Sequence, residues 1–242
     1  MFIDIHCHIL PGVDDGADSE ADSFEMLEQA YNSGTTAVVL TPHYLNKNRS
    51  RAGISRDDIV NAYRKIKADA AERNIPVKLY LGCELLCSAG ISEKIKDGNI
   101  IPINGSRYVL SEFYFNEKPE NAFAFTEELV SCGYVPVIAH PERYGFLHEN
   151  PAAIGRFLDL GCLLQVNKGS PLGVYGREAE EYSKWLILNE LAHCIAGDCH
   201  DTVRRNADMG DIYRWMLPIF EKDYIMYLLH DTPKRILLDK DI

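Results

Sequence analysis

The sequence has no long apolar run, no CxxC pair and no excess of positive charge. No hydrophobic stretch approaches the ~18 residues that a transmembrane helix needs. The opening segment, MFIDIHCHIL, has neither a basic leader nor a small-residue cleavage site, so we expect no signal peptide. The seven cysteines are odd in number and lack metal-type spacing, which favours reduced thiols over a disulfide framework. These absences predict a soluble cytoplasmic protein.

The net charge of −11 argues against a general nucleic-acid binder, because such a protein needs a basic face. It also argues against docking on an anionic membrane. A phosphate-bearing substrate would have to be attracted by local cations against the overall field. The chain has 242 residues and shows no linker, repeat or low-complexity tract, so we expect a single domain over 1–242. Composition leaves a homo-oligomer open.

Short apolar segments alternate with amphipathic ones along almost the whole chain. Such continuous apolar runs are typical of strands buried on both faces of a parallel sheet. The alternation predicts an α/β fold, either a barrel of about seven strands or a doubly wound open sheet. The predicted strands are Phe2–Ile5, Ala37–Leu40, Val77–Leu81, Tyr108–Leu110, Val135–Ala139, Leu163–Val166 and His193–Ala196. The predicted helices are Asp18–Ser33, Ser55–Arg73, Pro119–Cys132, Pro151–Leu160, Arg177–Asn189, Asn206–Phe220 and Thr232–Leu238.

Six of these seven strands run directly into a side chain that can bind a metal. The carboxyl ends of parallel strands are where barrel enzymes place their active sites. In His6-x-His8 and Asp198-x-His200 the period of two directs both side chains to the same side. Imidazoles with carboxylates suit Mn, Fe or Zn. The residues at these ends are His6, His8, His43, Glu84, Glu112, His140, Asp198 and His200.

Three further residues complete the predicted site. Asp14, in Asp14-Asp15-Gly16, could form a simple turn, but it follows the histidine pair closely and we favour it as a ligand. Arg143 and Arg205 lie shortly after His140 and His200, where a guanidinium can bind a phosphate in a bidentate manner.

The motifs DIHCHILPGVDDG, TPHY, GCE, HPERY, QVNKGSPLGVYG and GDCHD occur in this order along the chain. Together they resemble the polymerase-and-histidinol-phosphatase (PHP) superfamily. Within it, the sequence is most similar to the bacterial manganese-dependent protein tyrosine phosphatases of capsule and exopolysaccharide loci. The resemblance covers essentially the whole chain.

The resemblance implies a distorted seven-stranded (β/α) barrel with three metal ions, Mn²⁺ by preference and Fe or Zn as alternatives. One ion would be held by His6, His8, Glu84 and Asp198. A second would share Glu84 and add Glu112 and His140. The third would be held by Asp14, His43 and His200. Metal-activated hydroxide would attack the phosphate, with Arg143 and Arg205 stabilising the developing charge. The implied partner is a bacterial tyrosine autokinase that regulates polysaccharide synthesis.

The sequence departs from the family pattern at two places. Gly197-Asp198 stands where the family usually has Ser-Asp, and His200-Asp201 where it has His-Asn. Every expected ligand is nevertheless present.

Three alternatives remain open. Cys199 and Arg205 satisfy the Cys-x5-Arg spacing of a cysteine-dependent phosphatase, although the intervening residues lack glycine and include Asp201. A sister PHP enzyme could hydrolyse a small phosphoester such as histidinol phosphate. A barrel that only binds would be expected to have lost some of its ligands.

Overall fold

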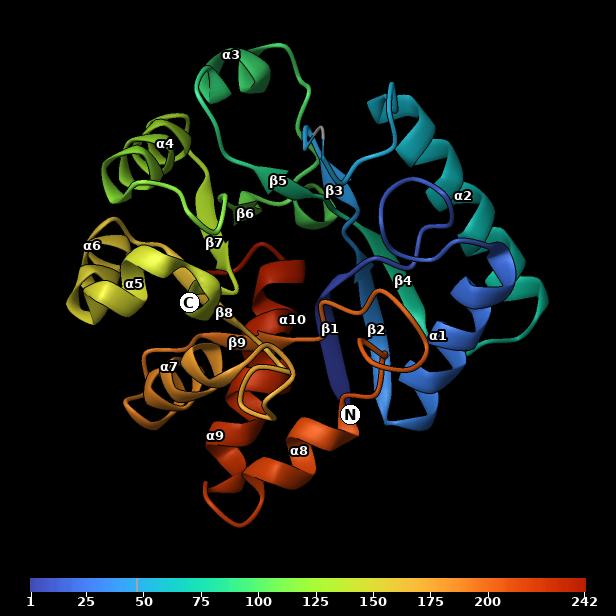
Figure 1. Ribbon diagram of the computed structural model, residues 1–242. Helices are drawn as coiled ribbons and strands as arrows, with labels where there is room; N and C mark the ends of the chain where they lie inside the picture. The colour runs from blue at the N-terminus through green and yellow to red at the C-terminus, as the bar shows by residue number, and fades with distance from the viewer. Residues whose placement is uncertain (47) are drawn as a thin grey trace.

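The computed structural model describes residues 1–46 and 48–242 and shows an α/β fold in which all strand pairings are parallel (Figure 1). The prediction of a parallel α/β architecture is confirmed. The strands are β1 (Phe2–Cys7), β2 (Thr35–Leu40), β3 (His43–Tyr44), β4 (Lys78–Leu81), β5 (Glu84–Leu86), β6 (Tyr108–Glu112), β7 (Val135–Ala139), β8 (Leu163–Asn167) and β9 (Cys194–Ala196).

The described residues form nine strands in two sheets, where seven strands were expected. One sheet has the order β1-β2-β4 and the other β3-β5-β6-β7-β8-β9. The two extra strands continue β2 and β4 after short interruptions at Thr41-Pro42 and Gly82-Cys83. Pro42 has no N–H to donate, which accounts for one interruption. The two sheets also meet between β1 and the segment after β9, where the backbone N–H of Asp198 donates to His6 O at 2.7 Å.

Most helices connect consecutive strands. Helix α1 begins at a capping box in which Ser19 and Asp22 bond each other's backbone N–H, and α2 begins in the same way at Ser55 and Asp58. The helices are α1 (Glu20–Asn32), α2 (Arg56–Glu72), α3 (Ile91–Lys96), α4 (Pro119–Ser131), α5 (Gly145–Glu149), α6 (Ile154–Asp159), α7 (Arg177–Leu188), α8 (Gly210–Met216), α9 (Lys222–Met226) and α10 (Thr232–Leu237). Short helical turns are η1 (Ile103–Gly105), η2 (Pro141–Arg143), η3 (Pro151–Ala153) and η4 (Tyr227–Asp231).

One predicted helix begins later than expected, for a local reason. The helix expected from Asn206 begins only at Gly210, because the side chains of Asn206 and Asp208 accept hydrogen bonds from backbone N–H groups and hold turns instead. The predicted start at Thr232 is confirmed, and α10 follows directly on η4. In the part of the chain that is described, none of the helices is both long and apolar enough to traverse a bilayer.

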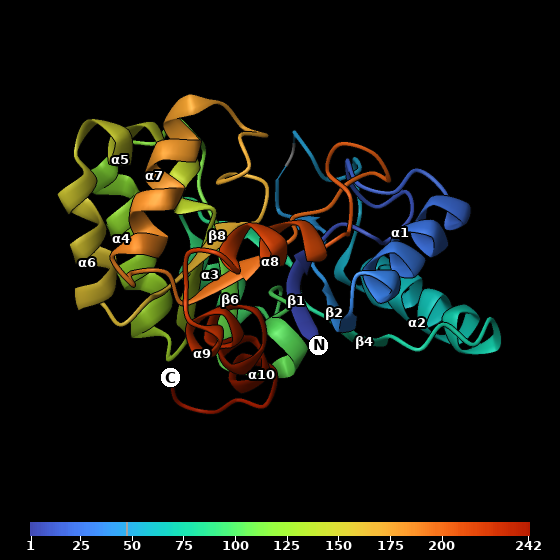
Figure 2. The same ribbon diagram turned by 90° about the horizontal axis from the view of Figure 1, so that it is seen from below.

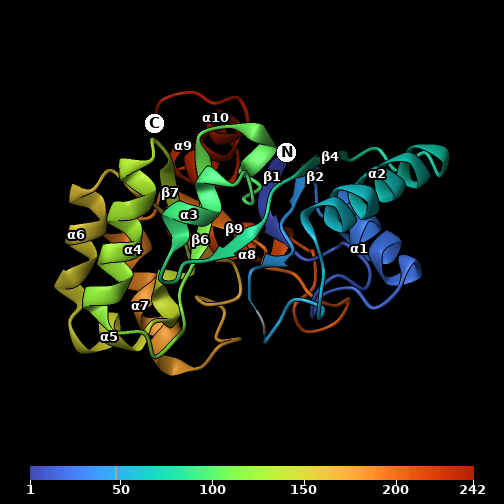
Figure 3. The ribbon, with the colours of Figure 1, turned by 90° about the horizontal axis from the view of Figure 1, so that it is seen from above.

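Apolar side chains pack on both sides of the strands. Figures 2 and 3 show α1 and α2 on one flank of the molecule and α4 to α7 on the other. On the inner side, Ile5, Val39, Leu110 and Val137 form a cluster with Ile236 of α10. This cluster fills the space at the amino ends of the strands. The polar residues at their carboxyl ends lie at the opposite end of the sheet.

Candidate metal centre

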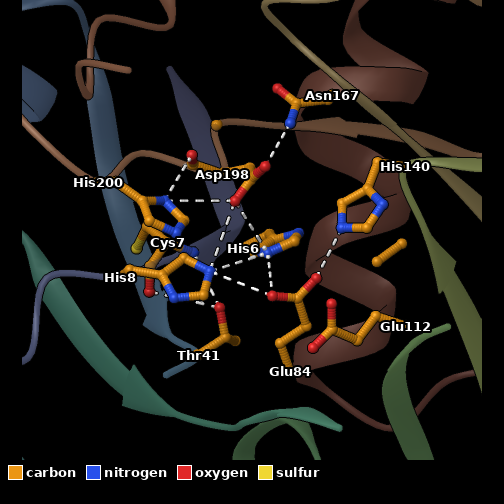
Figure 4. A network of polar contacts seen from close by, with 12 residues as sticks. His6, Cys7, His8, Thr41, Glu84, Glu112, His140, Asn167, Asp198 and His200 are labelled. Carbon is orange, nitrogen blue, oxygen red and sulfur yellow. Dashed lines mark hydrogen bonds and ion pairs between the residues drawn. The ribbon is translucent and has the colours of Figure 1, made fainter. Parts of the chain in front are cut away.

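The structure brings the strand-end histidines and carboxylates into one buried cluster (Figure 4). His6 Nε2 lies 3.2 Å from His8 Nε2, 3.3 Å from Glu84 Oε2 and 3.4 Å from Asp198 Oδ1. His8 Nε2 is 3.3 Å from the same Glu84 oxygen and 3.5 Å from the same Asp198 oxygen. Two ligand atoms about 2.1 Å from one ion at near-tetrahedral angles lie ~3.4 Å apart. These four side chains therefore have the spacing of a metal-binding set.

The ring orientations of both histidines are fixed from behind by other side chains. His6 Nδ1 lies 2.8 Å from Gln165 Oε1, on β8. His8 Nδ1 lies 2.7 Å from Asp14 Oδ2. An acceptor at Nδ1 directs the Nε2 lone pair toward the cluster, as is usual for metal-binding histidines. Asp4 Oδ1 in turn accepts from the backbone N–H groups of His6 and Gly197, which joins β1 to the end of β9.

Two further groups of possible ligands adjoin the first. One comprises His43, Glu84 and Glu112, with His43 Nδ1 2.9 Å from an oxygen of each carboxylate. The other comprises His8, Asp15, His43 and His200. His140 Nε2 lies 2.7 Å from Glu84 Oε1, beside the second group but outside the three groups found among the described residues.

Asp14 and Asp15 have different places from those expected. Asp15 Oδ1 lies 3.3 Å from Nε2 of both His43 and His200, in the position expected for Asp14. Asp14 faces the other way: its carboxylate accepts from the backbone N–H of His43 and contacts His8 Nδ1. The geometry thus makes Asp14 an orienting residue for His8 and Asp15 the candidate ligand.

Two cluster residues have backbone conformations that side chains rarely adopt. His140 has φ 36° and Asp198 has φ 48°, both in the left-handed region. Such strain persists where the surroundings enforce it, and it is concentrated at functional sites. Within the described residues, Glu84 Oε2 and His200 Nε2 are buried and lack a hydrogen bond. Unsatisfied buried donors and acceptors of this chemistry fit a divalent cation.

The electrostatics keep the carboxylates of the cluster ionised, and these carboxylates raise the pKa of His6, His8 and His43, so a metal ion would bind in place of the protons on these imidazoles. Burial alone would raise the pKa of Glu84, but His6 and His43 hold this pKa well below its usual range. Burial would also raise the pKa of Asp198, but Arg205 and His6 hold this pKa well below its usual range. Burial lowers the pKa of His200 to about 4, which leaves its imidazole neutral near pH 7.

Both predicted arginines reach the cluster through Asp198. Arg205 Nη2 lies 2.6 Å from Asp198 Oδ1, and Arg143 Nη1 lies 3.3 Å from Asp198 Oδ2. A third arginine, Arg49, was not predicted: its Nη1 lies 3.3 Å from His43 Nε2. Its place six residues after His43 was the available signal, since Arg205 follows His200 at a similar spacing.

The loop after Cys199 is not a phosphate cradle. Oδ1 of Asp201 accepts from the backbone N–H groups of Val203, Arg204 and Arg205 at 2.7, 2.6 and 3.1 Å. These are the donors that a Cys-x5-Arg loop would direct at a phosphate. The cysteine-dependent alternative therefore lacks its anion site, and Asp201 has a structural role in this turn.

Glu142 is a further residue that sequence reasoning did not assign. Its buried carboxylate accepts from Asn167 N–H at 2.8 Å and from Ser170 Oγ at 2.6 Å. Burial raises the pKa of Glu142 to about 7. Asn167 Nδ2 in turn donates to Asp198 Oδ2 at 2.5 Å. The sequence signal for Glu142 was its position between Pro141 and Arg143, because a charged residue there lies just after the end of a strand.

Comparison with known proteins adds a family to this geometry. The chain is 33% identical to tyrosine-protein phosphatase YwqE of Bacillus subtilis over 246 residues, which covers 99% of this chain and 93% of that protein. It is 38% identical to putative tyrosine-protein phosphatase CapC of Staphylococcus aureus, over 84% of this chain and 78% of that protein.

A solved structure is similar along nearly the whole length. It comes from work on YwqE of B. subtilis and CpsB of Streptococcus pneumoniae, described as metal-dependent tyrosine phosphatases. The match has a TM-score of 0.89 at 29% identity and covers 99% of this chain and 96% of that one. A mycoplasma amidohydrolase, at 13% identity and a TM-score of 0.64, shares the fold alone. A family model described as capsular polysaccharide synthesis, CpsB/CapC, matches residues 2–238, and the chain belongs to this family.

Proposed function

We propose that this chain is a metal-dependent protein tyrosine phosphatase acting on a phosphotyrosine-bearing bacterial kinase of capsule or exopolysaccharide synthesis. The observation that carries the proposal is the convergence of His6, His8, Glu84 and Asp198 with Arg143 and Arg205. The names of the relatives, tyrosine-protein phosphatases, support the substrate class. We also propose one distorted PHP-type barrel over 1–242, in a cytoplasm whose reducing conditions suit the seven free cysteines.

The residues fit three divalent ions, which we propose to be Mn²⁺. The first would be held by His6, His8, Glu84 and Asp198. The second would be held by Glu84, Glu112 and His140, with His43 close by. The third would be held by Asp15, His43 and His200. When bound, such ions activate water for attack and neutralise phosphate oxygens.

The protein's own residues bind and orient the phosphate. Arg143 and Arg205 contact Asp198 from outside the metal-binding groups. Their guanidinium groups therefore lie beside the position that a phosphate at this centre would occupy. Fixed donors at that position stabilise charge that develops on the phosphoryl oxygens. A tyrosyl phenolate, whose conjugate acid has a pKa near 10, leaves more readily than an alkoxide.

Substrate comparison tests the proposed function. The manganese-loaded protein should hydrolyse phosphotyrosine peptides with a higher kcat/KM than histidinol phosphate under the same conditions. A clear preference for histidinol phosphate would move the chain to a sister activity and leave the metal chemistry in place. Full activity after metal removal would contradict the proposal as a whole.

Arg143→Ala provides a second test. Because Arg143 contacts Asp198 with its guanidinium and is outside the metal-binding groups, kcat should fall on the order of 10²–10³-fold while bound metal is unchanged. Elemental analysis of the variant supplies the control. Wild-type kcat/KM in the variant would place Arg143 outside the reaction.

A further inference from the structure

Three arginines and two aromatic rings alternate around the candidate metal centre. The Arg143 guanidinium carbon lies 4.4 Å from the Phe115 ring centroid and 4.5 Å from the Tyr175 centroid. The Arg49 carbon lies 5.4 Å from Phe115, and the Arg205 carbon 5.8 Å from Tyr175. Phe115 and Tyr175 come from different loops, after β6 and after β8. Arg143 thus contacts both rings.

This arrangement places the Arg143 guanidinium over both rings. Contacts with the ring faces are attractive because of the charge distribution of an aromatic ring. The N–H groups of a guanidinium lie in its plane, and one of them reaches Asp198 at 3.3 Å. Arg143 therefore contacts both rings and Asp198 at once, beside the position proposed for the phosphate.

A hollow opens directly beside the same three side chains. It has a volume of about 420 Å³ and is lined by Phe115, Arg143 and Tyr175, together with His148 and the start of α7. This volume lies within the range of about 300–1,000 Å³ that is usual for small-molecule sites. A group attached to a phosphate bound at Arg143 can enter this hollow and contact both rings.

The position of Tyr175 is built into its loop. A Cβ at Gly169 would lie 2.9 Å from Cε2 of Tyr175 and 3.2 Å from Cβ of Val174, so the loop closes this tightly because residue 169 has no side chain. The beginning of the loop is anchored by the Glu142 carboxylate through Asn167 and Ser170. Tyr175 is therefore placed before a substrate arrives, which reduces the ordering cost of binding.

We propose that Phe115 and Tyr175 form an aromatic clamp that receives the ring of the substrate and gives this site its preference for aryl over alkyl phosphomonoesters. The inference rests on the proposed phosphatase function and names the residues that determine its specificity. A tyrosyl ring reaches both clamp rings from a phosphate at Arg143. A seryl or threonyl phosphate offers no ring, and its short side chain would draw the peptide backbone into the hollow.

Binding of two phosphonates to the manganese-loaded protein tests the clamp without the chemistry of bond cleavage. Phenylphosphonate and methylphosphonate share one head group and differ in the presence of a ring. Calorimetry should show that Phe115→Leu and Tyr175→Leu each reduce the preference for phenylphosphonate by about 2–10-fold, the scale of an aromatic pair. Phe115→Tyr and Tyr175→Phe retain a ring and should keep the preference.

Tyr114→Leu is the matched control, because Tyr114 is an exposed aromatic residue next to Phe115 that does not line this hollow. Its preference should equal that of the wild type. If both leucine variants weaken the two phosphonates equally, the rings merely support Arg143 and the proposal is overturned. An unchanged preference overturns it as well. Wild-type protein that binds phosphonates yet hydrolyses no phosphomonoester would contradict the proposed function instead.

Discussion

Asp15 and Asp14 are adjacent in the sequence but have different roles in the candidate metal centre. Its carboxylate faces His43 and His200, while Asp14 supports His8 from behind. Asp15→Asn should therefore bind one ion fewer at saturating Mn²⁺. Asp14→Asn should recover the full ion count at saturation, with metal affinity lowered about 10–100-fold, as for other residues that orient a histidine. Elemental analysis over a manganese titration separates the two, and the reverse pattern would restore Asp14 as the ligand.

Cys199 is buried beside Asp198 and His200, so its role can be separated from theirs by substitution. Since Asp201 occupies the backbone N–H groups that a thiol mechanism needs, Cys199→Ser should keep activity within about twofold. The measurement is kcat/KM together with metal content. An inactive variant with a normal metal content would return the thiol as nucleophile.

Which side chains come together in the cluster was easier to predict from the sequence for strand ends than for loops. His6 and His8 were predictable because period two on a buried strand places both rings on one side. The sequence favoured Asp14 where the geometry places Asp15, since a turn can direct either carboxylate inward and only the backbone path decides. The place of Phe115 depends on how separate loops meet, which no local pattern encodes.

Strand β1 and the residue after β9, Gly197, pack so closely that a side chain at position 197 has no room. A Cβ at Gly197 would lie 2.3 Å from Oδ2 of Asp4, whose carboxylate is buried and already bonded to two backbone N–H groups. The glycine that departs from the family pattern is thus required here by Asp4.

Gly197→Ala should destabilise the protein by about 1–3 kcal/mol, the usual cost of overpacking a buried site. For a chain of this size, that corresponds to a fall in Tm of roughly 2–12 °C. Gly155→Ala is the control, because Gly155 lies in α6 with no atom within 4 Å of the added carbon. It should leave Tm unchanged or raise it slightly, since alanine favours a helix. Equal Tm values for the two variants would contradict this account of Gly197.

The parallel arrangement of the strands was predictable from their continuous apolar sequences. Runs such as Val135–Ala139 are apolar throughout, and in the structure the strands around them are buried on both faces. The continuation of β2 and β4 into β3 and β5 was not predictable, because His43–Tyr44 and Glu84–Leu86 are too short to show a period. These two extensions place His43 and Glu84 opposite each other in register.

For the whole molecule, the consequence of this cluster is that folding and metal binding should be coupled. Residues from β1, β3, β5 and β6 and from the segments after β1, β7 and β9 supply the candidate ligands, so the chain must be folded before they meet. An ion that binds the folded state alone stabilises it by about 2.7 kcal/mol at a concentration 100 times its Kd. One such ion corresponds to roughly 5–11 °C in Tm, so removing all of the ions with a chelator should lower Tm by at least that much and abolish phosphatase activity, and added Mn²⁺ should restore both. Scanning calorimetry on the Glu84→Gln variant gives the control, because Glu84 takes part in two of the groups and its loss should remove most of the manganese-dependent shift. A shift of wild-type size in that variant would mean that the stabilising ion lies elsewhere on the protein.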